Sequence, residues 1–147
     1  MLVIYIEKNC EKIANAIAEG ASSIETKITS NPEELTGEKN AICLSKKPFG
    51  RETKAIEKQI NGKTIFIIGA GFSFQDMRLA SEQLQKNNAK IENTLCLKRV
   101  GLIPLGAEIN ETELVRAKAF GERIASTITG IRPKQENEKN RIRNYHK

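Results

Sequence analysis

The sequence predicts an α/β fold in which a five-stranded parallel sheet lies between two layers of helices. Short, continuous apolar runs rich in Val and Ile are typical of strands buried on both faces. Segments with apolar residues at helical spacing separate these runs, and strands and helices alternate along the chain, which favours parallel strands joined by right-handed crossovers. A length of 147 residues is enough for one domain with its own core.

The first strand and helix are the best marked. Leu2 to Ile6 is a continuous apolar run and is predicted as a buried strand. Glu11 to Gly20 follows with apolar residues at helical spacing, Asn9 as its expected N-cap and Gly20 as its expected C-terminal glycine.

The next elements are weaker. Apolar and polar residues alternate from Ile24 to Ile28, which predicts a strand at or near an edge of the sheet. Asn31 to Asn40 is predicted as a loop, Ala41 to Leu44 as the third strand, and Arg51 to Ile60 as a helix with one apolar face.

The second half continues the alternation. Thr64 to Ile68 is the most apolar strand, and a helix is predicted from about Asp76 to Asn88. Ile91 to Leu97 is the fifth strand. A loop from Arg99 to Glu108 then leads to a last helix, from about Asn110 to Thr129.

Composition excludes several classes of protein. The single histidine, His146, lies in a polar tail, which argues against a Ser-His-Asp triad and against a histidine-based zinc site. Three cysteines without C-x-x-C spacing suggest neither a disulfide framework nor a zinc cluster, and they fit a reducing cytoplasm. The opening apolar run is too short for a membrane span, so we expect a soluble cytoplasmic protein.

The positive charge is concentrated at the C-terminus. The chain has a net charge of +6, and residues 132–147 hold six basic residues against two acidic ones, or +4 of that total. A basic tail could contact an acidic surface, but a solvated, flexible terminus is the more ordinary interpretation. Apart from Tyr145, aromatic residues are not interleaved with the basic ones, so nucleic-acid binding is not favoured.

A ligand of a doubly wound sheet lies beyond the carboxyl ends of the strands. In this sequence those ends are followed by three loops: Glu7 to Cys10, Ser45 to Gly50, and Gly69 to Gln75. We therefore expect the functional site where these loops meet.

Residues 1–131 resemble a flavodoxin-like domain. The likeness lies in Val3-Ile4-Tyr5 leading into Asn9 to Ala14, in Gly62 to Gly71, and in Ala117 to Ala125. The resemblance implies strand order 2-1-3-4-5, flavin mononucleotide (FMN) as cofactor, and either single-electron transfer or flavin-dependent reduction of small acceptors.

The expected phosphate loop departs from the family pattern. Such domains usually place hydroxyl side chains and backbone N–H groups around the phosphate, at the start of the first helix. This chain has Lys8, Asn9, Cys10 and Glu11 there, with no hydroxyl group and with Glu7 and Glu11 adding negative charge. We expect at most a degenerate phosphate site, although the helix start still offers N–H groups.

The loops expected to contact the flavin ring are aromatic. They hold three of the five phenylalanines of the chain. The candidate cofactor-binding residues in these two loops are Lys46, Pro48, Phe49 and Gly50, and Gly71, Phe72, Ser73 and Phe74. The phenylalanines could clamp a flat ring or fill the core, and the sequence alone leaves both open.

The cysteines have ordinary interpretations. Cys10 lies at a helix start beside Lys8, where a thiolate could form, but Glu7 and Glu11 oppose this and a small buried residue is favoured. Cys43 and Cys96 lie within strands and are expected in the core.

Two classes of function follow. The first is an FMN-binding redox protein that exchanges electrons with a partner protein or a small electron acceptor, without a catalytic side chain; a reductase with its own substrate is not separated from it by the sequence. The second is a flavin-free module that binds a partner protein or an acidic surface. Exposed aromatic residues at a loop edge would also suit a homodimer.

Overall fold

The computed structural model describes residues 1–6, 10–45, 56–98 and 110–130. Five strands form one parallel sheet in the order β2-β1-β3-β4-β5, which confirms the predicted fold class and strand order. The strands are β1 (Leu2–Ile6), β2 (Thr26–Thr29), β3 (Asn40–Ser45), β4 (Thr64–Ala70) and β5 (Lys90–Leu97).

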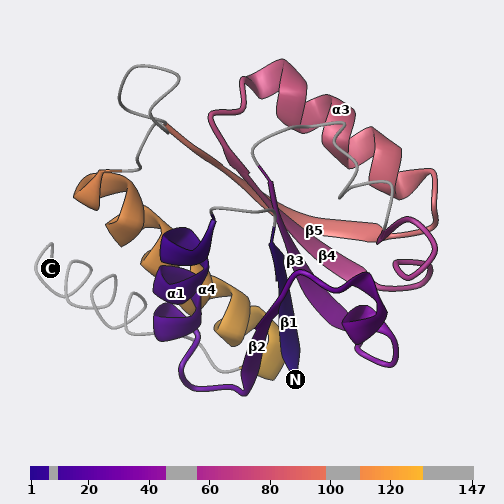
Figure 1. Ribbon diagram of the computed structural model, residues 1–147, viewed down its shortest axis with the longest axis horizontal. Coiled ribbons are helices and arrows are strands. Elements are labelled where there is room, and N and C mark those ends of the chain that lie inside the picture. Colours follow the sequence, from indigo (N-terminus) through magenta and orange to yellow (C-terminus); the bar gives the residue numbers. More distant parts are fainter. Residues whose placement is uncertain (7–9, 46–55, 99–109, 131–147) are drawn as a thin grey trace, which may run out of the picture.

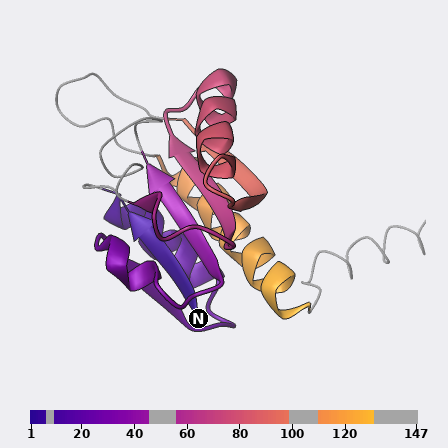
Figure 2. The same ribbon diagram turned by 90° about the vertical axis from the view of Figure 1, so that its right-hand side faces the viewer.

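Helices cover both faces of the sheet (Figure 1). α1 (Glu11–Gly20) and α4 (Glu111–Thr129) lie side by side on one face, and α3 (Phe74–Gln85) covers the other. Figure 2 shows the same separation of α3 from α4 after a quarter turn. The arrangement is the three-layer α/β/α sandwich that alternating strands and helices predict.

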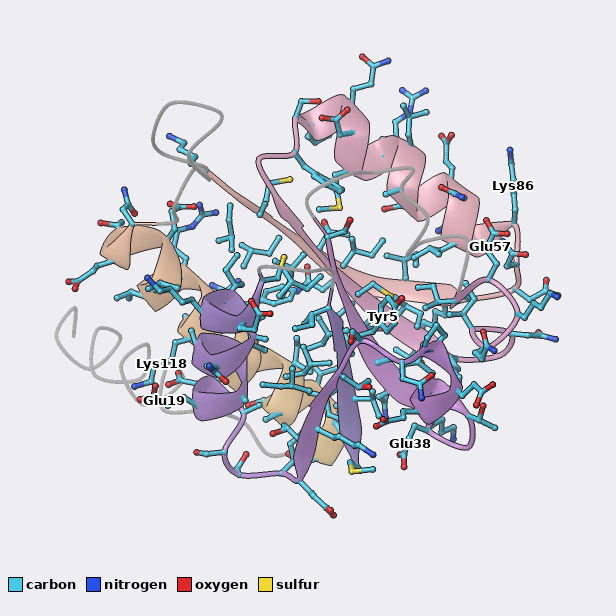
Figure 3. All side chains as sticks on the ribbon, in the orientation of Figure 1. Tyr5, Glu19, Glu38, Glu57, Lys86 and Lys118 are labelled. Atoms are coloured by element: carbon cyan, nitrogen blue, oxygen red, sulfur yellow. The ribbon has the colours of Figure 1, made fainter. Side chains whose placement is uncertain are left out.

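Two apolar clusters fill the spaces between the layers. Since successive side chains of a strand point to opposite faces, each central strand contributes to both clusters. The cluster beneath α1 and α4 includes Leu2, Ile4, Ile42, Phe66, Ile68, Ile13, Ile17, Phe120 and Ile124. The cluster beneath α3 includes Val3, Tyr5, Ala41, Cys43, Ile65, Ile67, Phe72, Met77, Ala80 and Leu84, together with Ile56 and Ile60. Tyr5 is labelled near the middle of the sheet in Figure 3.

α1 and α4 approach each other through two glycines. A Cβ atom at Gly20 would lie 1.9 Å from the carbonyl oxygen of Lys118, and one at Gly121 would lie 2.2 Å from that of Ile17. Gly20 is the last residue of α1 and Ala21 is its C-cap, so the prediction of Gly20 as a capping glycine was wrong. Gly20 is required because the backbone of α4 passes where a side chain would lie.

Several element boundaries differ from the predicted ones. β2 begins at Thr26 and not at Ile24, because the N–H of Ile24 donates to Ala21 in the preceding turn. α3 begins at Phe74 and not at Asp76, because Ser73 caps it. The predicted loop after Asn31 contains a short 3-10 helix, η1 (Pro32–Leu35), which the Asn31 side chain caps.

Other predictions fall partly or wholly outside the described residues. The helix predicted from Arg51 to Ile60 lies outside them for residues 51–55. In the described part only Ile56 is helical and residues 57–59 form a turn, so the predicted helix end was wrong, although Ile56 and Ile60 are buried as expected. The loop at 99–108 and the tail at 132–147 lie entirely outside. Among the helices that the structure describes, none has the length and apolar character needed to cross a membrane.

Candidate functional site

The carboxyl ends of the five parallel strands share one edge of the sheet, where the three loops were expected to meet. Of the candidate residues, the structure describes two at the start of α1 and four in the turn between β4 and α3. The other candidates lie outside the described residues: Lys8, Asn9, Lys46, Pro48, Phe49 and Gly50.

The turn between β4 and α3 is held at both ends. Gly71 has φ +80°, a conformation that favours glycine, and its N–H donates to the carbonyl of Leu97 at the end of β5, at 2.7 Å. The N–H of Asp76 donates to Ser73 Oγ at 3.1 Å, and the N–H of Ser73 donates to Asp76 Oδ2 at 3.0 Å. This reciprocal capping box fixes the start of α3.

The two phenylalanines of this turn have opposite environments. Phe72 is 8% exposed and belongs to the core beneath α3. Its ring covers Gly69, where an added Cβ would lie 2.2 Å from Phe72 Cγ. Phe74 is 88% exposed. Of the two interpretations left open for the phenylalanines, packing in the core fits Phe72, and Phe74 is the ring that this turn exposes.

The start of α1 differs from the prediction of an Asn9 cap. The helix begins at Glu11, so Cys10 is its N-cap, and no side-chain hydrogen bond caps the helix there. Cys10 is 1% exposed, within the cluster beneath α1 and α4, whereas Glu11 is exposed. The Cys10 thiol therefore lies in the core, which confirms the prediction that Cys10 is a small buried residue.

Glu113 is a buried carboxylate at this edge that the sequence pattern did not single out. It is 5% exposed and accepts a hydrogen bond from the N–H of Lys98 at 2.7 Å and one from Arg116 at 2.8 Å. The Asn110 side chain in turn accepts from the N–H of Glu113 at 3.0 Å, which caps α4. The spacing from Asn110 to Glu113 is that of a capping box, and this pattern is the signal in the sequence from which a role for Glu113 could have been predicted.

Glu113 joins the end of β5 to the first turn of α4. Burial by itself would raise the pKa of its carboxyl group, but the Lys98 N–H and the Arg116 guanidinium outweigh burial and hold that pKa below its ordinary value. The carboxylate is therefore charged at neutral pH and acts as a structural tie.

The other two cysteines, Cys43 and Cys96, both have thiols of raised pKa. Cys43 is buried, and burial raises the pKa of its thiol to about 12. Cys96 is half-buried, so its expected place in the core is confirmed only in part, and burial raises the pKa of this thiol as well. Within the described ranges, no group of three His, Cys, Asp or Glu side chains could hold a metal ion.

Solved structures share this fold at low sequence identity. A two-electron reduced flavodoxin from Megasphaera elsdenii superposes with a TM-score of 0.58 at 12% identity, over 84% of this chain and 99% of that one. A flavodiiron core from Synechocystis has a TM-score of 0.63 at 15% identity, over 89% of this chain but only 36% of its own. A short-chain flavodoxin associated with a non-canonical PDU bacterial microcompartment has a TM-score of 0.50 at 14% identity, over 85% of this chain and 97% of that one.

These matches establish the fold and nothing finer. The chain has the flavodoxin-like fold that its sequence resembles. No family model and no curated protein matches its sequence.

Proposed function

We propose that this protein of flavodoxin-like fold is a flavin-binding redox protein, with its ligand at the carboxyl edge of the sheet. The observation that carries the proposal is the exposed ring of Phe74 on a turn tied to β5 by Gly71 and capped by Ser73. Phe74 is 88% exposed, so its ring is available to stack on a flat ligand. Neighbours of this chain in fold are flavodoxins by name.

The residues divide into a part that fits the flavin ring and a part that fits the phosphate poorly. A rigid turn with an outward-facing aromatic ring suits a flat heterocycle, since stacking adds about 1 kcal/mol beyond the area buried. Phe49 and its neighbours Lys46, Pro48 and Gly50 are proposed as the opposite wall. FMN is the proposed cofactor, with its phosphate directed to the residues from Lys8 to Glu11.

The bound flavin would supply the redox chemistry, and the protein would supply position and exclusion of water. Electrons would pass at the exposed edge of the ring, to a partner protein or to a small acceptor. If the electron acceptor were a small substrate, the same flavin site would make the protein a flavin-dependent oxidoreductase. We place the protein in the cytoplasm on the composition of the sequence.

The direct test is an FMN titration of the purified protein, followed by quenching of flavin fluorescence. Wild-type protein is expected to bind saturably. A Phe74→Ala variant should bind FMN about fivefold more weakly, the equivalent of about 1 kcal/mol of lost stacking. The matched control is Val115→Ala, which shortens another exposed apolar side chain, 66% exposed on α4, and should leave affinity unchanged.

Absence of binding would favour the second function, a flavin-free module. The poor phosphate chemistry at the start of α1 is the observation that supports it. The same edge would then dock a partner protein or a second copy of the chain, with Phe74 as the anchor. Sedimentation velocity of the wild type and of Phe74→Ala would test for a homodimer. A dimer in the wild type that is lost in Phe74→Ala would indicate a second copy as the partner, and a monomeric wild type would indicate a different protein.

A further inference from the structure

An Asn-Gly pair forms the tight turn that leads into β4, at the amino edge of the sheet. The N–H of Lys63 donates to the carbonyl of Ile60 at 3.0 Å, so Asn61 and Gly62 are the two central residues of this turn. Gly62 has φ +76°, a conformation that glycine adopts without steric cost. Ile60 and Lys63 are buried, whereas Asn61 and Gly62 are exposed. The pair therefore projects into water from a turn that is anchored on both sides.

An Asn-Gly pair can react with itself. The backbone nitrogen of the glycine reaches the asparagine side chain with the least steric hindrance, because glycine has no Cβ. At Asn61 the amide nitrogen of Gly62 would form a bond to Cγ, the Cγ–Nδ2 bond would break, and Nδ2 would leave as ammonia with the amide proton. Water then opens the succinimide ring at either of its carbonyls and leaves aspartate or isoaspartate. The reaction needs no reactant besides water.

A native hydrogen bond opposes this reaction. The nucleophile, the N atom of Gly62, donates its proton to the carbonyl of Asn88 at 3.0 Å. Attack on Asn61 requires that this bond breaks and that the nitrogen turns toward Cγ. One such bond shifts the equilibrium between closed and open forms about fivefold toward the closed form. The exposure of Asn61 predicts a fast reaction, and the bond from Gly62 predicts a slow one.

The acceptor of this bond lies in a conformation that few residues tolerate. Asn88 is in the left-handed region, with φ +63°, which asparagine adopts more readily than most other residues. Its N–H donates to the carbonyl of Gln85, the last residue of α3, at 3.0 Å. The backbone conformation at position 88 therefore sets the place of the carbonyl that holds Gly62.

We propose that Asn61 is a site of spontaneous deamidation that the native fold protects, so that its modification records opening of the turn at residues 60–63. The site lies at the opposite edge of the sheet from the proposed ligand and is independent of it. The isoaspartyl product has a longer backbone between Ile60 and Lys63. Because both side chains are buried, the longer backbone cannot keep them in place together with the hydrogen bond between their backbones. We expect the modified protein to unfold at a lower urea concentration.

Peptide mapping by mass spectrometry measures the reaction. Wild-type protein is incubated at mildly alkaline pH, both native and unfolded in urea, and the modified fraction of Asn61 is followed in the tryptic peptide 59–63. The native rate should be lower than the unfolded rate by at least about fivefold. In urea Asn61 should react before Asn87, which precedes a residue with a side chain. A smaller difference between the native and unfolded rates, or earlier modification of Asn87, would overturn the proposal.

Two substitutions at position 88 test the protecting bond. Asn88→Gly keeps the left-handed conformation and should leave the native rate at Asn61 unchanged. Asn88→Ala strains that conformation and should make the native reaction at least about fivefold faster than in Asn88→Gly. Asn61 is followed in its own peptide, apart from Asn87, which precedes the new glycine in the control variant.

Circular dichroism shows whether both variants are folded under the conditions of the assay. Equal native rates in two folded variants would mean that the bond from Gly62 to Asn88 does not protect Asn61, and would overturn the proposal. If Asn88→Ala did not fold, the native and unfolded rates of the wild type would decide.

Discussion

Replacing Gly121 by alanine tests the close contact between α1 and α4. An alanine Cβ at this position would lie 2.2 Å from the carbonyl oxygen of Ile17 and 3.2 Å from the N atom of Ala21. Ordinary contacts of a Cβ begin near 3.4 Å, so the two helices would have to separate by about 1 Å. Because the clashing atoms belong to the backbone, no change of side-chain rotamer can relieve the clash.

The expected cost follows from two opposing terms. Overpacking usually costs about 1 to 3 kcal/mol, and a backbone clash belongs at the upper end, because a gap of about 1 Å forfeits up to half of the dispersion energy of the contacts it opens. Alanine restores about 1 kcal/mol of helix propensity relative to glycine. The net destabilisation is about 2 kcal/mol, which corresponds to a decrease of about 6 °C in Tm for a chain of this size.

Urea and thermal unfolding followed by circular dichroism measure this change. The control is Glu122→Ala, an exposed neighbour on the same helix, which should unfold within about 0.5 kcal/mol of wild type. Gly20→Ala makes the reciprocal clash, 1.9 Å from the carbonyl oxygen of Lys118. The double variant should lose less than the sum of the two single losses, because the first separation makes room for the second. A Gly121→Ala protein as stable as wild type would refute the close packing.

Two further predictions concern titratable groups. Because the pKa of Glu113 is lowered in the folded state, its contribution to stability is present above its ordinary pKa of about 4.5 and lost as the pH falls through the folded value. The urea midpoint of wild type should therefore fall more steeply below pH 4.5 than that of Glu113→Gln, and equal slopes would contradict the assigned bonds to Lys98 and Arg116. Cys43, with its pKa raised to about 12, should resist iodoacetamide in the native protein and react after unfolding, whereas half-buried Cys96 reacts faster; peptide mapping that found Cys43 alkylated at the unfolded rate would contradict its burial.

Local pattern was sufficient to predict most of the fold. Continuous apolar runs gave β1, β3 and β4 within two residues at each end, because a strand buried on both faces must be apolar throughout. The edge strand β2 was displaced by two residues, since few of its side chains are buried and the pattern there is weak. The start of α3 was missed because Ser73 and Asp76 cap each other, which brings Phe74 into the helix.

The sequence predicted where the candidate site lies on the sheet, but not which side chains face it. The topology of a parallel sheet locates the loops at one edge, and this follows from the order of elements. Phe72 and Phe74 are alike in the sequence, separated by one residue. Only the tertiary structure distinguishes them, because the Phe72 ring packs where Gly69 lacks a side chain, whereas Phe74 is 88% exposed.

The sequence by itself determined the layers and the absence of hydroxyl side chains from Lys8 to Glu11, because these depend on residue type and on alternation along the chain. The strand order came from the resemblance to flavodoxin-like domains. The tertiary structure decided which aromatic ring faces water, why Gly20 and Gly121 are glycines, and that Glu113 ties β5 to α4. Each of these depends on contact between segments distant in sequence. Such contacts leave no periodic pattern along the chain, so packing alone reveals them.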